Sequence, residues 1–224
     1  MGMGKIALGA VVGVVVIAAV SANADDGKDT SASAAHRPGS KQDKGAGKEA
    51  GGRAAAKKKA AFDGDGEFQV GSDIKPGTYR TTGNTDGMCY WERAKDASGE
   101  MDSILANDNV SGTSYVTVKA GDKLFKSHGC ADWEAVAVKA KGSPASAMDG
   151  DGGMFKVGTD IAPGTYKSAG NSDDSCYWER DKDAEHGLDS IIANNNVKGT
   201  AVVTVGAGDA YFKTTGCGNW KKTA

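Results

Sequence analysis

Serine and aspartate side chains recur together in this sequence and are the first candidates for catalysis. Ser103 follows Asp102, and Ser190 follows Asp189 in the same sequence context. A serine nucleophile needs a histidine or another base to take its proton. The histidines of the chain stand at positions that do not recur. We therefore expect no serine hydrolase.

Pairs of carboxylates can hydrolyse a glycoside when they flank its bond, and they are the second possibility. Glu92 directly precedes Arg93, which favours surface ion pairs on neighbouring strands, and Asp122 follows a glycine in an expected turn. A small domain also offers little depth for a cleft. We expect the protein not to be an enzyme, and a hydrolase is the least favoured function. The recurring acids are Glu92 and Glu179, Asp102 and Asp189, and Asp122 and Asp209.

Two aspartate-glycine segments, Asp63–Gly66 and Asp149–Gly152, resemble the start of a calcium-binding loop. An EF-hand loop needs glycine at its sixth position and glutamate at its twelfth, where the first segment has Phe68 and Ile74. We expect turns here, with no metal site and no cofactor. The polar cluster Asn107–Asn109 also suits a turn.

An aromatic pair inside a recurring CYWER motif offers the best binding candidates. Adjacent residues of a strand point to opposite faces, so one ring of each pair must face inward and the other outward. An outward ring beside an arginine would form a platform on which a sugar or a peptide stacks. The alternative is that all the rings pack in the core. The candidate ligand-binding residues are Tyr90, Trp91, Arg93, Tyr177, Trp178 and Arg180.

These recurrences belong to one tandem repeat. Gly66–Trp133 aligns without gaps to Gly153–Trp220, with 41 identical residues among 68, and we name these segments the first and the second copy. A repeat of this length is a duplicated domain. Turn signals separate short segments rich in Val, Thr, Tyr and Ile, which is a strand pattern. We predict an all-β fold with two small domains, each a sandwich or a partly open barrel.

Particular strands can be placed within each copy. In the first copy we expect one strand over residues 78–81 that ends at Gly83, and another over Cys89–Arg93. A hairpin should join residues 116–118 to residues 124–126 through a glycine-aspartate turn.

Each copy carries two cysteines at matching positions. Four cysteines allow three pairings, and only one respects the repeat: Cys89 with Cys130, and Cys176 with Cys217. Closing a loop of about 40 residues contributes roughly 4 kcal/mol in the chain-entropy model. That is a large share of the stability of a domain close to the lower size limit.

The amino terminus predicts export. Lys5 precedes an apolar stretch that ends in Ala22-Asn23-Ala24, the pattern of a signal peptide and its cleavage site. We expect cleavage after Ala24, with an uncleaved membrane anchor as the alternative. No cysteine follows the apolar stretch, so we expect no lipid anchor. An oxidising compartment agrees with the predicted disulfides.

The charge changes sign along the chain. Residues 25–62 hold nine Lys and Arg against five Asp and Glu without apolar periodicity, which predicts a disordered basic linker. No basic stripe interleaved with aromatic residues follows, so we expect no nucleic-acid partner. The predicted organisation is a signal peptide or anchor (1–24), the linker (25–62), β repeat 1 (63–134), a second linker (135–148) and β repeat 2 (149–224).

The patterns VGxDIxPGTY, CYWER and GCxxW resemble a repeat of secreted proteins and lipoproteins of actinobacteria. The resemblance covers Phe68–Trp133 and Phe155–Trp220. It implies an exported, disulfide-bonded domain and assigns no catalytic residue. The departure is the amino terminus, which lacks the lipid-bearing cysteine of the lipoprotein members.

Together these features predict an exported, non-catalytic tandem-repeat protein that is secreted or associated with the cell envelope. Its β domains should bind an unknown envelope polymer, glycan or protein, and two similar copies favour bivalent binding. The alternative is a wall-associated structural spacer without a specific ligand. Contact with a membrane is expected only through an uncleaved amino-terminal segment.

Overall fold

The computed structural model describes residues 60–137 and 142–223. Both copies belong to one compact unit, Ala54–Ala224. The predicted signal peptide lies outside the described residues, as do residues 25–59 of the first predicted linker and residues 138–141 of the second.

The two copies contain the same succession of elements. The first copy and its flank comprise β1 (Gly66–Gln69), β2 (Gly77–Ala94), the 3₁₀ turn η1 (Met101–Ser103), β3 (Ile104–Val118), β4 (Leu124–His128) and β5 (Glu134–Ala135). The second comprises β6 (Ala147–Met148), β7 (Gly153–Lys156), β8 (Gly164–Asp181), η2 (Leu188–Ser190), β9 (Ile191–Val205), β10 (Tyr211–Thr215) and β11 (Trp220–Lys222). The described residues contain no α-helix.

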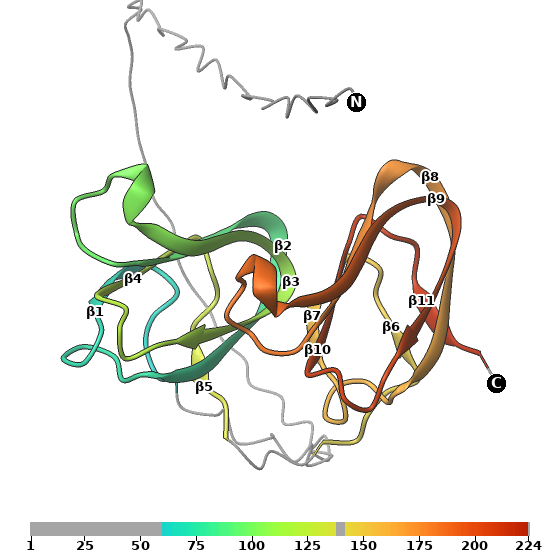
Figure 1. Ribbon diagram of the computed structural model, residues 1–224, viewed down its shortest axis with the longest axis horizontal. Helices are drawn as coiled ribbons and strands as arrows, with labels where there is room; N and C mark the ends of the chain where they lie inside the picture. The colour runs from blue at the N-terminus through green and yellow to red at the C-terminus, as the bar shows by residue number, and fades with distance from the viewer. Residues whose placement is uncertain (1–59, 138–141, 224) are drawn as a thin grey trace, which may run out of the picture. The chain divides into compact units, whose positions relative to one another are not determined.

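Each copy forms an open, mainly antiparallel sheet around one very long strand. In the first copy the order is β1-β4-β2-β3, and β5 also pairs with β2. In the second copy β8 pairs with β10, β9 and β11. The ribbons β2–β3 and β8–β9 are long and strongly bent (Figure 1). The predicted all-β fold with two tandem domains is confirmed, and the sheets do not close.

The predicted end of a strand at Gly83 is wrong, because β2 continues through this residue. The pairing of β2 with β3 shifts register on either side of Asn84, and Gly83 has a φ of 87°. Buried Asn84 donates to the carbonyl oxygen of Gly112 (3.0 Å) and accepts from the amide of Ala131 (2.8 Å). The side-chain amide thus replaces ladder hydrogen bonds where the strand bulges and bends.

The predicted hairpin of residues 116–118 and 124–126 is also wrong. β3 and β4 do not pair with each other, because β2 lies between them and pairs with both. A turn signal marks a change of direction and does not say which strands become neighbours. The expected turn at Asn107–Asn109 is likewise part of β3.

Equivalent aromatic cores and disulfides hold the two copies. Trp133 and Trp220 are fully buried. Their indole nitrogens donate to the hydroxyls of Ser127 and Thr214, both at 2.9 Å. The predicted cysteine pairing is confirmed: the structure contains the disulfides Cys89–Cys130 and Cys176–Cys217.

The two copies also pack against each other through a separate apolar cluster. A parallel bridge joins Thr113 of β3 to Gly153 of β7. Gly153 has a φ of 77°, and a Cβ there would overlap the Thr113 carbonyl, so only glycine permits this approach. The buried members of the cluster are Tyr115, Met154, Ala184 and Tyr211. The two copies are therefore packed against each other.

Candidate functional site

The predicted platform residue Trp91 lies in the core. Its side chain is fully buried, and its indole nitrogen donates to Ser114 (3.2 Å). Trp178, its equivalent, is partly buried and packs beside Phe212. The neighbouring ring Tyr90 points the other way, as alternation requires. For Trp91 the structure therefore supports the interpretation that the ring packs in the core.

The tyrosines of the CYWER motif lie half-buried on the outer face of their strands. The Tyr90 hydroxyl donates to Glu92 (2.7 Å), and the Tyr177 hydroxyl donates to Glu179. Their rings are therefore held by the carboxylate two residues further along the same face. Asn107 donates to the Tyr90 hydroxyl from β3.

The predicted ion pairing with a neighbouring strand is found for Glu92, which pairs with Lys126 of β4. Arg93 points to the opposite face, and its ion pair is buried. Arg93 is 4% exposed and binds both carboxylate oxygens of Asp122, at 2.6 and 3.1 Å. It also donates to the Glu185 carbonyl of the second copy (2.7 Å). Its equivalent Arg180 makes the same bidentate contact with Asp209, at 2.6 and 2.9 Å, but with a side chain that is 25% exposed.

The remaining candidate acids and serines serve local structure. Glu92 pairs with Lys126 (3.0 Å). The Ser103 hydroxyl donates to Asp96 (2.6 Å) inside a loop. Asp65, from the calcium-like segment, accepts from the Gly129 amide (2.6 Å).

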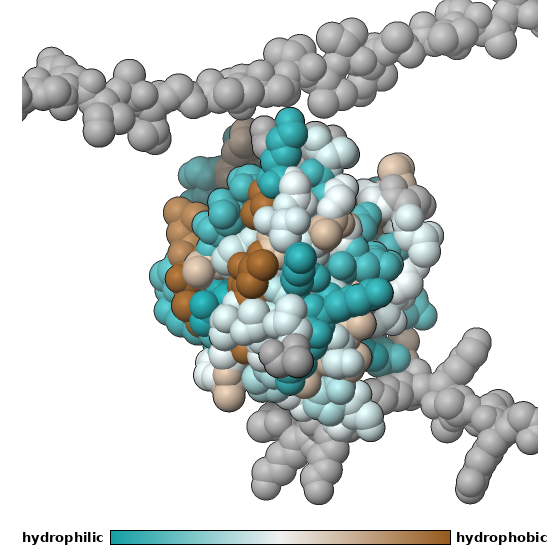
Figure 2. All heavy atoms as spheres, turned by 90° about the vertical axis from the view of Figure 1, so that its right-hand side faces the viewer, coloured by the Kyte–Doolittle hydropathy of each residue, from teal (hydrophilic) through white to brown (hydrophobic). Residues whose placement is uncertain are grey.

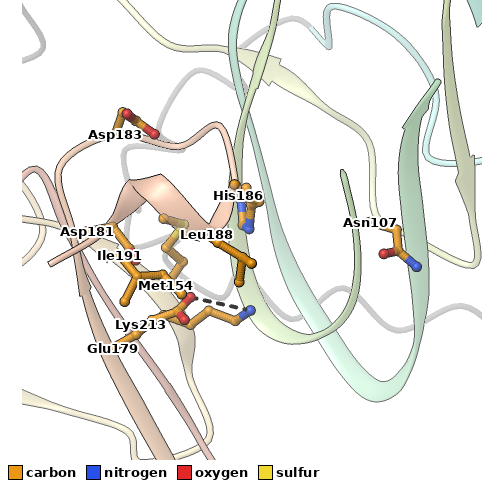
Figure 3. Close-up of a pocket in the computed structure, with 10 residues that line it drawn as sticks. Asn107, Met154, Glu179, Asp181, Asp183, His186, Leu188, Ile191 and Lys213 are labelled. Atoms are coloured by element: carbon orange, nitrogen blue, oxygen red, sulfur yellow. Dashed lines mark ion pairs between the residues drawn. The ribbon is translucent and has the colours of Figure 1, made fainter. Parts of the chain in front are cut away.

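A cavity that the sequence did not reveal lies on the outer face of β8. Strand alternation places Tyr177, Glu179 and Asp181 on this face. Lys213 of β10 stands opposite Glu179 in the register, and their ion pair is dashed in Figure 3. The cavity measures about 130 Å³. Its lining includes Glu179, Asp181, Asp183, His186 and Lys213, with apolar walls from Met154, Leu188 and Ile191.

Asp181 is the most unusual group in this cavity. It is 3% exposed, and its Oδ2 has no hydrogen-bond partner among the described residues. Burial, together with the negative charge of Glu179, raises the pKa of Asp181 to about 8. The first copy has Ala94 at this position, so the fold does not require a carboxyl group here.

Lys213 carries a charge between two carboxylates from different copies. Its Nζ lies 2.8 Å from Asp108 of β3 and 3.8 Å from Glu179. Burial disfavours its charged form, but these carboxylates outweigh that effect and raise the pKa of Lys213. Together with Asp183 at the rim, these charged groups give the surroundings of Asp181 a net negative charge.

His186 holds the loop beside the cavity against the first copy. Its Nε2 donates to the Tyr115 carbonyl (2.7 Å), and its ring meets the Trp91 ring edge-on at 4.7 Å. Burial lowers the pKa of His186, which keeps the imidazole neutral with its proton on Nε2. Its φ is 57°, and the equivalent Gly99 has a φ of 74°. A histidine thus occupies a left-handed position at the cost of some backbone strain.

The signal for this site was present in the sequence as a difference between the copies. Ala94 becomes Asp181 and Gly99 becomes His186, whereas Glu92 and Lys126 are retained as Glu179 and Lys213. Residues that both copies share do not include these two positions, which is why the repeat by itself does not mark the site.

Two further observations concern only the part of the chain that the structure describes. No group of three or more His, Cys, Asp or Glu side chains there is arranged to hold a metal ion. No helix within those residues has the length and apolarity needed to cross a bilayer.

Comparison with known proteins places the chain in a family. The model of the Rv1352-like extracellular domain matches residues 60–134 and again residues 146–221. The uncharacterized protein Rv1352 of Mycobacterium tuberculosis is 30% identical over 88 residues, which cover 34% of this chain and 72% of that protein. The uncharacterized protein Mb1387 of Mycobacterium bovis matches to the same extent. No solved structure shows a significant match. The chain therefore belongs to the family of Rv1352-like extracellular domains and carries two of these domains in tandem.

Proposed function

We propose that this protein is exported and binds an extracellular ligand without transforming it, and that the cavity at Asp181 receives a cationic amino group of that ligand. The observation that carries the proposal is the buried Oδ2 of Asp181, which lacks a hydrogen-bond partner among the described residues. Leaving such an oxygen unsatisfied costs about 1–3 kcal/mol, and a donor supplied by a ligand would recover this free energy.

The charge of the surroundings favours a cation over a neutral donor. Glu179, Asp183 and Asp108 contribute negative charge near the cavity, and Lys213 offsets only one of them. An ammonium group would also favour the ionised form of Asp181 and gain a charge-assisted hydrogen bond.

The size of the cavity limits what enters it. A cavity of about 130 Å³ accommodates a small group carried on a short chain. Such a group would be one end or one side group of a larger molecule. The apolar walls of Met154 and Ile191 suit the carbon stem that carries an amino group. An amino sugar or a peptide of the cell envelope presents such a group.

A non-catalytic role is supported by the engagement of the candidate nucleophiles. Ser190 donates to Asp183 (2.6 Å), and Ser103 donates to Asp96 (2.6 Å), so both hydroxyls serve as loop hydrogen bonds. The neutral His186 already donates its Nε2 proton to a backbone carbonyl.

Binding is tested with small probes of similar size and different charge. Ethylammonium, ethanol and acetate are titrated into the protein at pH 7.5, and binding is followed by NMR chemical shifts. A three-atom cation is expected to bind with about −4 kcal/mol, roughly millimolar, whereas the other two probes should not bind.

Two variants locate the binding. Asp181→Ala should abolish the shifts, whereas Asp189→Asn, which alters an exposed carboxylate of the same copy, should leave them unchanged. If ethylammonium and ethanol bind equally, the cation hypothesis fails. If no probe binds, the spacer without a ligand becomes the better hypothesis.

Export and retention are tested separately. We propose that residues 1–24 act as a cleaved signal and that the mature protein begins at Asp25. Amino-terminal sequencing of protein from the culture medium should return Asp25 as the first residue. Recovery of only the full-length chain from membranes would favour the uncleaved anchor.

A further inference from the structure

The second copy inserts a loop into a surface of the first copy. The inserted loop, residues 183–187, is named the plug. The Thr117 amide donates to the Ala184 carbonyl (2.7 Å), and Arg93 donates to the Glu185 carbonyl (2.7 Å). The receiving surface, named the socket, consists of Trp91, Arg93, Tyr115 and Thr117.

The second copy contains an equivalent socket that no described residue fills. Val202, the equivalent of Tyr115, is 60% exposed, whereas Tyr115 is 2% exposed. Trp178 is partly exposed, whereas Trp91 is fully buried. The equivalent socket consists of Trp178, Arg180, Val202 and Thr204.

The first copy contains an equivalent plug, residues 96–100, with the same internal bonding. Asp96 accepts from the Ser98 amide (2.9 Å), as Asp183 accepts from the Glu185 amide (3.0 Å). Gly99 has the left-handed φ that His186 has in the second copy. Ala97 is exposed, although its equivalent Ala184 is buried. This plug is thus preformed, and Ala97, Ser98 and Gly99 at its tip are exposed.

We propose that the free plug of one molecule docks into the free socket of a second molecule, so that the protein associates head to tail. The carbonyl oxygens of Ala97 and Ser98 would accept from the Thr204 amide and from the Arg180 guanidinium, as in the contact between the copies. Such a contact joins two different surfaces, and it extends to further molecules when its geometry does not close a ring.

The association is weaker than the contact within one chain, because two of the side chains that make that contact have smaller equivalents. Val202 replaces the ring of Tyr115, and Gly99 replaces the imidazole of His186. The side on which β8, β9 and β11 lie is mostly hydrophilic, with only scattered apolar residues (Figure 2). Association should therefore become detectable only at high protein concentration.

Sedimentation velocity of residues 25–224, over a concentration series up to the millimolar range, tests the proposal. The average mass of the wild type should rise with concentration. Val202→Asp changes an exposed residue of the free socket and should weaken association at least tenfold. Leu188→Asp is the control, because this side chain is also exposed but lies beside the plug that is already docked.

A gain of function provides the second arm. The double variant Gly99→His with Val202→Tyr restores the ring and the imidazole and should associate at least tenfold more tightly than the wild type. Circular dichroism verifies that each variant remains folded. A wild type that stays monomeric throughout the series overturns the proposal, as does association that Val202→Asp leaves unchanged. Association of this kind does not depend on ligand binding at Asp181.

Discussion

Removing the acid of a buried ion pair should cost much more stability in the first copy than in the second. We consider Asp122→Ala and its matched partner Asp209→Ala. Each aspartate binds the arginine of its copy through two hydrogen bonds. Each also accepts from the amide three residues earlier, at 2.8 Å. Both variants therefore remove the same hydrogen bonds from the turn.

The difference lies in what happens to the arginine afterwards. The Arg93 side chain is 5% exposed and is covered by the second copy, so its charge remains buried without a carboxylate. An uncompensated buried charge costs about 3–5 kcal/mol. The Arg180 side chain is 25% exposed and can turn into water, so the loss falls to roughly 1–2 kcal/mol.

Urea unfolding followed by tryptophan fluorescence measures both losses. With an m-value of about 2 kcal/mol/M, the midpoint should fall by about 1.5–2.5 M for Asp122→Ala and by about 0.5–1 M for Asp209→Ala. Equal losses in the two variants would refute the argument, because they would mean that packing of the second copy does not confine Arg93.

Three further predictions concern the site, the contact between the copies and the disulfides. His186→Gly removes a hydrogen bond and a ring contact that together contribute about 2 kcal/mol, and it relieves about 1 kcal/mol of backbone strain. Urea unfolding should therefore show that the free energy of unfolding falls by roughly 1 kcal/mol. A gain in stability would contradict the assigned contacts. Because the pKa of Asp181 is raised from 3.8 to about 8, the folded protein holds a proton that the unfolded chain releases, and this contribution to stability should decline as the pH rises from about 4 to about 8. Urea unfolding at several pH values should show that decline in the wild type and a flatter profile in Asp181→Asn; identical profiles would rule out a titrating Asp181. The double variant Cys176→Ser with Cys217→Ser should lose about 4 kcal/mol, measured in the same way, and a loss below 1 kcal/mol would mean that the disulfide constrains the unfolded chain little.

The sequence determined the features that depend on local pattern and on duplication. The repeat specified the pairing of Cys89 with Cys130, because a duplicated domain must contain its own disulfide. The alternation along Cys89–Arg93 specified that Tyr90 and Trp91 face opposite ways. Strand propensity and regular turn signals specified an all-β fold. Each of these follows from residues close in sequence or related by the repeat.

Only the tertiary structure decided which surfaces meet. The long strand β2 separates β3 from β4, and no turn motif encodes that insertion. Arg93 is buried because the second copy covers it, whereas the identical motif leaves Arg180 partly exposed. Asp181 is buried only because β10 and a neighbouring loop cover its position on β8. Burial and charge are set by atoms distant in sequence, so identical residues in the two copies acquire different properties.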